Sequence, residues 1–517
     1  MSTNLVSITA RESDWKAIDT GITIGKDILE LLSSAMYVDP MTVYREYIQN
    51  AADSIDESHA SSDGLKIQGQ VDITIDTSSR SVVITDNGPG VPEAEFTDRL
   101  TAFGGSRKRG KPARGFRGVG RLAGIGYCQE LIFHSRAAGE EGISELRWDC
   151  KKLKSILRSP DIKDDLESAV AQVVTTRKLH SPVGQTGSFF KVEMRGIVRH
   201  RNDQLLNSTA VAHYLSQVGP VPLDDSFGGR DAILAHLGNT VQLGNIAIRI
   251  NGGDSLTRPY RTDFSFTETE TDRISELQLV TVPALDGEIA ALGWIAHPSY
   301  LGALPVGLGI RGLRLRVGNI QIGDERLLEE LFPETRFNVW SVGEIHILDS
   351  RITPNGRRDH FEQNVHFNNL LTHLVPIARE ISQRCRANSA NRRWLRDFDI
   401  RASKVHDKLA VLKQAAIGKK ERGAFETQIK ADLDHLKHIS EGGLLPIDTS
   451  LMLRGRLQEL SKEVARRFKV GPKTSPLDSM PAPKKRAFEQ MIGLIYECSG
   501  NQAAAKTLVD KILERLK

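Results

Sequence analysis

Residues 44–56 read YREYIQNAADSID and predict a helix, because they lack Gly and Pro and their polar side chains recur at helical spacing. Glu46, Asn50 and Asp53 stand at positions i, i+4 and i+7, so they share one face, and the only cation, Arg45, is expected to point elsewhere. An amide one turn from a carboxylate suits a hydrated Mg²⁺, which takes oxygen ligands. The carboxylate would stand where it can orient a water molecule and accept its proton. Alone, such a face is typical of solvent exposure, so the interpretation depends on the segments that follow.

The next segment is a predicted hairpin of two strands, residues 71–75 and 81–85, which leads directly into the sequence DNGPGV. Asp86 ends the second strand, and Gly88 and Gly90 follow it. An acid at a strand end gives a buried hydrogen-bond acceptor, and the glycines leave the backbone beside it open. A flat base with an exocyclic amino group can dock in such a place. The alternative interpretation is an ordinary surface turn.

A glycine-rich, cationic loop comes third. Residues 101–129 contain Lys or Arg at seven positions and no acid, and the loop opens into an apolar stretch. A polyphosphate requires backbone N–H groups, a helix N-terminus and neutralising cations. No Gly-Lys-Ser/Thr follows, so this is not a Walker A loop, and the alternative is a flexible basic loop. The candidate binding residues here are Ser106, Arg107, Gly115, Phe116, Arg117, Gly118, Val119 and Gly120.

The fourth segment, TGSFFKV at residues 186–192, places small hydroxyl side chains before a strand. In this order the four segments resemble the GHKL, or Bergerat-fold, ATPases. These include the ninety-kilodalton heat-shock chaperones, MutL mismatch-repair proteins, type II topoisomerase ATPase subunits, MORC proteins and histidine kinases. Residues 45–56 are most similar to the chaperone version and residues 115–118 to the mismatch-repair version. The mixture indicates an outlying branch of the superfamily.

The resemblance implies a role for each motif. Glu46 would be the general base, Asn50 the Mg²⁺ ligand, and Asp86 the acceptor for the adenine amino group of ATP. Asp53 would lie near the sugar or base. The other implied contacts are Gly88 and Gly90 with the base, Gly115, Gly118 and Gly120 with the phosphates inside a mobile lid, and Ser188, preceded by Thr186, with the base.

Composition limits the class of protein. The chain has 517 residues, of which 39% are hydrophobic and 26% charged, as is typical of globular proteins. Its net charge of +4 is too small to indicate nucleic-acid binding by itself. The four cysteines form no Cys-x-x-Cys pair, which favours a reducing compartment and excludes a cysteine zinc cluster. No secretory leader or long apolar run is found, so we expect a cytoplasmic protein without membrane association.

The order of predicted elements indicates an α+β protein with four domains. A Bergerat-fold ATPase α/β sandwich would occupy residues 1–200, an α/β transducer (middle) domain 201–375, a helical hairpin or coiled coil 376–445 and a helical C-terminal domain 446–517. Residues 156–174 are expected to be helical, and Gly418 and Gly423 to break residues 403–439 into two helices. In the middle domain we expect strands at 239–251, 277–282, 288–297, 313–322 and 344–348, and helices at 203–218 and 324–331.

A loop late in the middle domain reads ITPNGRRD at residues 352–359. In the chaperones a similar loop supplies an Asn and an Arg, and the Arg reaches the terminal phosphate of ATP. The resemblance implies Asn355 and Arg358 for these roles, with Arg357 as the competing choice. A cation delivered by a second domain stabilises developing charge only when the domains close. The alternative is a basic turn with solvated or paired arginines.

These inferences predict an ATPase, a dimeric clamp of the heat-shock-chaperone type that couples Mg-ATP-driven closure of a homodimer to action on a protein client. The alternative is a MORC- or MutL-like ATPase that acts on DNA in genome defence or repair, which the arginines around Trp394 favour. A sensor histidine kinase fits badly, because no His precedes the helix at residues 44–56. A scaffold that binds ATP and barely hydrolyses it is a further alternative.

Overall fold

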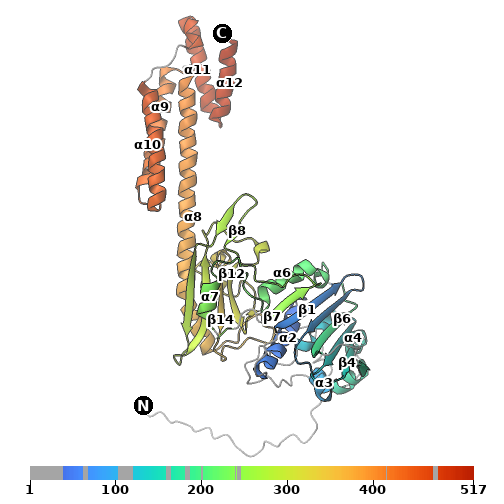
Figure 1. The fold of residues 1–517 in the computed structure, drawn as a ribbon. Helices are drawn as coiled ribbons and strands as arrows, with labels where there is room; N and C mark the ends of the chain where they lie inside the picture. Colours follow the sequence, from blue (N-terminus) through green and yellow to red (C-terminus); the bar gives the residue numbers. More distant parts are fainter. Residues whose placement is uncertain are drawn as a thin grey trace, which may run out of the picture. The chain divides into compact units, whose positions relative to one another are not determined.

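The protein is described from a computed structural model (Figure 1). The described residues are 39–61, 68–102, 120–158, 165–180, 187–199, 202–238, 240–241, 246–414, 416–469 and 475–516. The chain divides into two compact units, residues 1–381 and 382–517. Eight of the predicted site residues lie outside the described residues: Ser106, Arg107, Gly115, Phe116, Arg117, Gly118, Val119 and Thr186.

The first sheet has seven strands in the order β5-β4-β3-β6-β2-β1-β7. All neighbours pair antiparallel except β7 (Ile246–Ile250), which lies parallel to β1. This last strand comes from beyond residue 200, where the first domain was expected to end. The other six strands are β1 Gly69–Asp76, β2 Ser81–Asp86, β3 Glu130–Arg136, β4 Gly142–Asp149, β5 Val174–His180 and β6 Phe189–Arg195.

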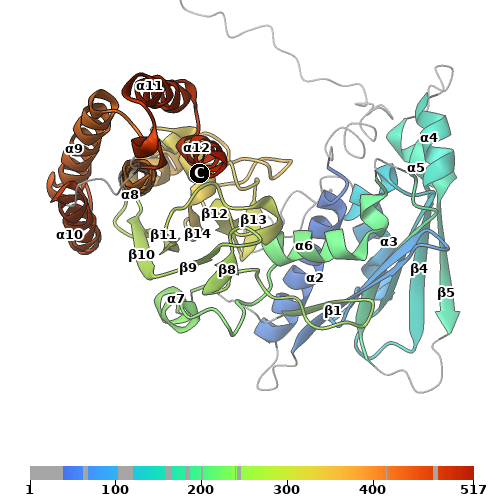
Figure 2. The same cartoon turned by 90° about the horizontal axis from the view of Figure 1, so that it is seen from above.

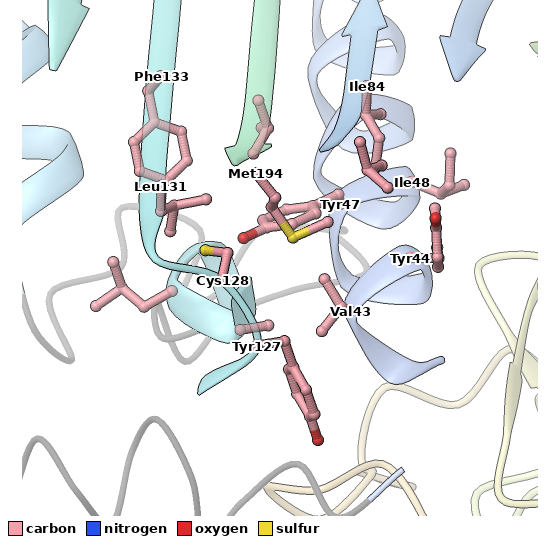
Figure 3. Packing of buried hydrophobic residues seen from close by; sticks show 14 of the residues in the cluster. Val43, Tyr44, Tyr47, Ile48, Ile84, Tyr127, Cys128, Leu131, Phe133 and Met194 are labelled. Carbon is pink, nitrogen blue, oxygen red and sulfur yellow. The ribbon is translucent and has the colours of Figure 1, made fainter. Parts of the chain in front are cut away.

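One face of this sheet packs on helices, and in β1 the buried side chains of Val71, Ile73 and Ile75 alternate with more exposed ones. The central helix on that face is α2 (Thr42–Ser61). Figure 3 shows Val43, Tyr47 and Ile48 of this helix packed in one cluster with Leu131, Phe133 and Met194 of the sheet. The remaining helical elements described before β6 are α3 Glu93–Thr101, the 3₁₀ turn η2 Gly120–Gly126, α4 Cys150–Arg158 and α5 Leu166–Val173.

The helix expected over residues 156–174 is only partly correct. The described chain forms α4 and α5 there and then turns into the edge strand β5. The sequence of β5, VTTRKLH, has most side chains exposed and no apolar alternation, so its strand character comes from pairing with β4.

The second sheet has five strands in the order β10-β11-β14-β12-β13. The expected single strand over residues 313–322 is a hairpin instead, because Gly318 and Asn319 form a turn with positive φ. The expected helix over residues 324–331 is wrong. The Asp324 side chain accepts a hydrogen bond from the Arg326 N–H, which favours a turn, and only a 3₁₀ turn, η5 (Glu329–Leu331), follows. The strands are β10 Glu276–Pro283, β11 Ile289–His297, β12 Gly312–Val317, β13 Ile320–Ile322 and β14 Val342–Ile347.

Two helices, α6 (Ser208–Val218) and α7 (Arg230–Leu237), precede this sheet, and β8 (Asp263–Ser265) pairs with β9 (Thr271–Arg273). The helix α6 packs on α2 (Figure 2). Just before it, the carbonyl of Leu205 accepts a hydrogen bond of 2.5 Å from the Tyr44 hydroxyl. Helix α2 is therefore held by contacts with both the sheet and α6.

The described part of the second unit is helical. The long helix α8 (Val365–Lys413) begins in the first unit and includes Pro376. Gly418 precedes α9 (Lys419–Glu441) as expected, but Gly423 lies inside α9 and does not break it. A helical Gly costs about 1 kcal/mol, which burial of Phe425 and its apolar neighbours offsets. The last helices are α10 Ile447–Lys469, α11 Ala482–Cys498 and α12 Gln502–Arg515. Throughout the described residues, every helix is too short or too polar to cross a membrane.

Candidate functional site

The predicted polar face of α2 lies at the centre of the site. Glu46 and Asp53 are buried, with 6% and 7% of their surfaces exposed, and Asn50 between them is half-buried. Their positions follow from the helix, whose apolar side faces the sheet and leaves these three side chains on another face. The spacing of these residues alone would also fit a solvent-exposed helix face. The burial of the two carboxylates shows that this face is not exposed.

Two arginines contact Glu46. The Nη2 atom of Arg45 lies 3.5 Å from Glu46 Oε1, and the Nε atom of Arg358 lies 3.6 Å from the same oxygen. The expectation that Arg45 points elsewhere is therefore wrong. Its side chain is long enough to bend back beside its neighbour, although adjacent helix positions face different directions.

The glycine-rich segment ends against the same carboxylate. A Cβ atom on Gly120 would overlap Glu46 Oε2, so only glycine fits there without displacing the carboxylate. The turn η2 is fixed to the helix, because the Gly124 N–H donates a hydrogen bond of 3.0 Å to the Tyr47 hydroxyl. Of the eight candidate residues in this loop, Gly120 is described and lies in the site.

Asp86 forms the second part of the site, at the end of β2. Its side chain is 5% exposed, and its Oδ1 accepts a hydrogen bond of 2.9 Å from the Gly88 N–H. Burial raises the pKa of the Asp86 carboxyl to about 7, and the Gly88 N–H opposes this rise. A buried acid with one backbone donor can still accept a hydrogen bond from a ligand.

Neighbouring atoms lie close to both glycines that follow Asp86. A Cβ atom on Gly88 would lie 2.8 Å from both Asp86 Oδ1 and Ser54 Oγ of α2. Gly90 has a φ of +70°, and a Cβ atom there would overlap the carbonyl of Arg136. The motif is therefore packed between the helix and β3.

Ser188 comes to the same end of the sheet as Asp86. Strands β2 and β6 pair antiparallel with Asp86 opposite Phe190, so Ser188 lies just before the paired residues of β6. The Ser188 side chain is half-buried. Next to it, the Arg136 guanidinium donates hydrogen bonds to the Gly187 carbonyl, which fixes the segment that enters β6.

The loop of the second sheet reaches the site through Arg358. The Nη1 of Arg358 donates a hydrogen bond to Gln49 Oε1 on α2, whereas the Arg357 side chain is exposed. The carbonyls of both residues accept hydrogen bonds from Arg45, at 3.0 Å for Arg357 and 3.5 Å for Arg358. The amide of Asn355 donates within the loop instead, to Asp359 at 2.6 Å. Between the two arginines that the sequence left open, Arg358 is the one that faces Glu46.

Sequence reasoning missed Gln49, which is 1% exposed and forms part of the α2 surface that receives Arg358. Its spacing of three residues from Glu46 was the available indication. Asn50 carries an amide oxygen, a ligand type that divalent ions accept, one helical turn after Glu46. Among the described residues no group of three or more His, Cys, Asp or Glu side chains is placed to hold a metal ion.

Two comparisons with known proteins found similar sequences, one with a family model and one with curated proteins. Residues 38–176 match the family described as Histidine kinase-, DNA gyrase B-, and HSP90-like ATPase. The chain is also similar to proteins named chaperone protein HtpG. The identity is 26% over 204 residues with that of Alkalilimnicola ehrlichii, covering 35% of this chain and 29% of the relative. It is 27% over 139 residues with that of Polaromonas sp., covering 23% and 22%. The aligned part therefore spans less than a third of these relatives.

Proposed function

The first domain belongs to the GHKL superfamily of ATPases, of the heat-shock-chaperone type, and from this premise we propose that the protein binds Mg-ATP and hydrolyses it to ADP and phosphate. The observation that carries the proposal is the group formed by Glu46, Gly120 and Arg358. It combines a buried carboxylate, a glycine backbone that approaches it closely, and a cation from the loop after the second sheet. A base for the attacking water, a close backbone and a cation are components that catalyse phosphoryl transfer.

The roles of the side chains follow from their chemistry. Asp86 would accept a hydrogen bond from the adenine amino group, and Gly88 and Gly90 would leave room for the ring. Glu46 would orient the attacking water and accept its proton. Asn50 would hold Mg²⁺, which supplies neutralising charge for the phosphates when bound. Arg358 would stabilise the charge that develops on the terminal phosphate.

Replacing the carboxylate of Glu46 tests the hydrolysis step. Glu46→Gln keeps the shape of the side chain and removes the base, so turnover should fall by about 10² to 10⁴ while the dissociation constant for ATP changes little. Steady-state ATPase assays and titration calorimetry measure the two quantities. Unchanged turnover would show that Glu46 is not the base. A wild-type protein that takes up no ATP would overturn the whole proposal.

The action of the protein as a dimeric clamp on a protein client rests on the chaperone relatives. Closure that brings Arg358 to the nucleotide would couple hydrolysis to the movement of one domain against another. The particle mass with and without a non-hydrolysable ATP analogue tests dimerisation. Suppression of the aggregation of a heat-denatured protein, with and without ATP, tests the client. A protein that stays monomeric with and without the analogue would contradict the proposed dimeric clamp.

A second candidate function, action on DNA, is favoured by one segment of α8. Residues 382–396 contain no acid and carry arginines at positions 384, 386, 392, 393 and 396. The guanidinium of Arg393 lies 5.7 Å from the ring centroid of Trp394. Such a helix can neutralise phosphates, and its binding to duplex DNA would weaken steeply with salt. Electrophoretic shift over a salt series tests this, and no shift at low salt would remove the candidate.

A further inference from the structure

Gln49 contacts Arg358, the side chain that brings a cation from the loop after the second sheet to the site. Gln49 lies on α2, three residues after Glu46 and directly before Asn50, with 1% of its surface exposed. Its amide oxygen accepts a hydrogen bond from Arg358 Nη1, and Arg358 Nε lies 3.6 Å from Glu46 Oε1. Two atoms of one planar guanidinium therefore face two residues of a single helix. Contacts at two points fix the orientation of a rigid, planar group as well as its position.

The backbone of the loop is held separately from this side chain. Arg45 donates hydrogen bonds to the carbonyls of Arg357 and Arg358. Arg358 also has a φ of +57°, a left-handed conformation that is uncommon for a residue with a side chain. These contacts bring the loop to α2, but they leave the direction of the Arg358 side chain undetermined. Gln49 accepts a hydrogen bond from that side chain, next to its ion pair with Glu46.

The neutrality of this acceptor has a consequence for the charge in the site. A carboxylate at position 49 would form a stronger hydrogen bond with Arg358 but would cancel its charge. It would also add an anion beside Glu46 and Asp53, which are both already buried. An amide holds the guanidinium without adding a second anion to the Glu46 carboxylate that Arg358 already faces.

We propose that Gln49 is a positioning residue for hydrolysis, whose amide oxygen orients the Arg358 guanidinium toward the terminal phosphate without adding a second negative charge beside it. This inference rests on the proposed ATPase function. It assigns Gln49 no contact with the nucleotide. The affinity for ATP should therefore be independent of residue 49, and the rate of hydrolysis should depend on it.

The first test replaces Gln49 and a matched control in the full-length protein. Gln278→Ala is the control, because Gln278 is half-buried on β10, where its Oε1 accepts a hydrogen bond of 3.2 Å from His297 Nε2. Gln49→Ala should lower kcat by about 10- to 100-fold with an unchanged dissociation constant for ATP. Gln278→Ala should keep the wild-type kcat. Equal kcat values for the two variants would overturn the proposal.

A double-mutant cycle then tests whether Gln49 acts through Arg358. Combining Gln49→Ala with Arg358→Ala should give the kcat of Arg358→Ala alone, because an arginine that is absent cannot be misoriented. Two losses that multiply would overturn the proposal. Gln49→Glu should also be slower than wild type, since it keeps the hydrogen bond and cancels the charge. Wild-type kcat in Gln49→Glu would overturn the requirement for a neutral acceptor.

The same series separates failure of this inference from failure of the proposed function. If the wild type hydrolyses ATP and Glu46→Gln abolishes turnover, while Gln49→Ala matches wild type, only the role of Gln49 is wrong. If the wild type neither binds nor hydrolyses ATP, the proposed function is wrong and the role of Gln49 falls with it.

Discussion

Arg358 Nε lies 3.6 Å from Glu46 Oε1, so a loop of the second sheet brings a cation to the buried carboxylate of the first. The neighbouring Arg357 gives a matched comparison, because its side chain is exposed while its backbone carbonyl accepts a hydrogen bond from Arg45 of α2. Arg358→Ala should reduce kcat for ATP by about 10² to 10³, the usual loss when one group that stabilises transition-state charge is removed. Arg357→Ala should stay within a factor of about two in the same steady-state assay. Equal losses in both variants would contradict the assignment of Arg358.

The Asp86 carboxyl should make nucleoside binding depend on pH. Burial raises its pKa to about 7, so the site is mainly protonated at pH 6 and ionised at pH 8. The ionised form is the better acceptor for an amino group, so adenosine affinity should fall by up to about tenfold per pH unit below 7. Adenosine is the suitable probe because it carries no phosphate that titrates. Calorimetry at pH 6, 7 and 8 measures the effect, and constant affinity would contradict it.

The variant Asp86→Asn is the control for adenosine binding, and it also tests how the stability of the protein depends on pH. The raised pKa means that the folded protein binds a proton that the unfolded chain has lost, so wild-type stability decreases as pH rises from about 4 to 7. Asparagine removes the charge, so this part of the pH dependence should disappear in urea unfolding. Adenosine binding should be weak at every pH. An Asp86→Asn protein that binds as tightly as wild type would show that this residue does not hold the base.

The sequence was sufficient where function depends on local spacing. Glu46, Asn50 and Asp53 share a face because they lie within two turns of one helix, and the end of β2 places Asp86 beside two glycines. Pairing between distant segments could not be derived in this way. The parallel strand β7 joins β1 across the intervening α6 and α7, and no local pattern specifies that partner.

The contact between Gln49 and Arg358 could not be predicted from the sequence for the same reason. Gln49 has no charge and no motif of its own, and its importance depends on which loop packs against α2. The choice between Arg357 and Arg358 is likewise decided by backbone geometry, since the two differ in side-chain direction and not in chemistry. The left-handed φ of Arg358 is not encoded in a recognisable Gly or Asn.

A buried ionic network should dominate the stability of the second sheet. Glu344 is fully buried and paired with Arg316 Nε at 2.7 Å and with Arg258. Glu344→Gln leaves two buried guanidinium groups without their carboxylate, so the free energy of unfolding should fall by about 3–5 kcal/mol. Asp263→Asn is the control, because its pair with Arg273 is 68–70% exposed and should contribute about 0–1 kcal/mol. Urea unfolding measures both, and equal midpoints would contradict the prediction.

The same network predicts the direction in which the stability of the protein changes with pH. Although burial raises the pKa of the Glu344 carboxyl, Arg258 and Arg316 hold it well below its ordinary value. A depressed pKa stabilises the folded state above the unfolded pKa, near 4.5, and this contribution is lost as the pH falls further. The difference in stability between wild type and Glu344→Gln should therefore shrink on acidification below about pH 4. A difference that grows would contradict the ionised state of Glu344.

A side chain at Gly120 should disturb the carboxylate beside it. A Cβ atom there would overlap Glu46 Oε2, so Gly120→Ala must displace either the proposed general base or the end of the glycine-rich segment. A displacement of about 1 Å at a reacting group can cost about 10² in rate, so kcat should fall by that order. Gly307→Ala is the matched control, since a Cβ atom there meets no atom within 4 Å. It should keep wild-type kcat and thermal stability. If Gly120→Ala hydrolyses ATP as fast as Gly307→Ala, then either Glu46 is free to move without loss of function or it is not the base, and the activity of Glu46→Gln decides between the two.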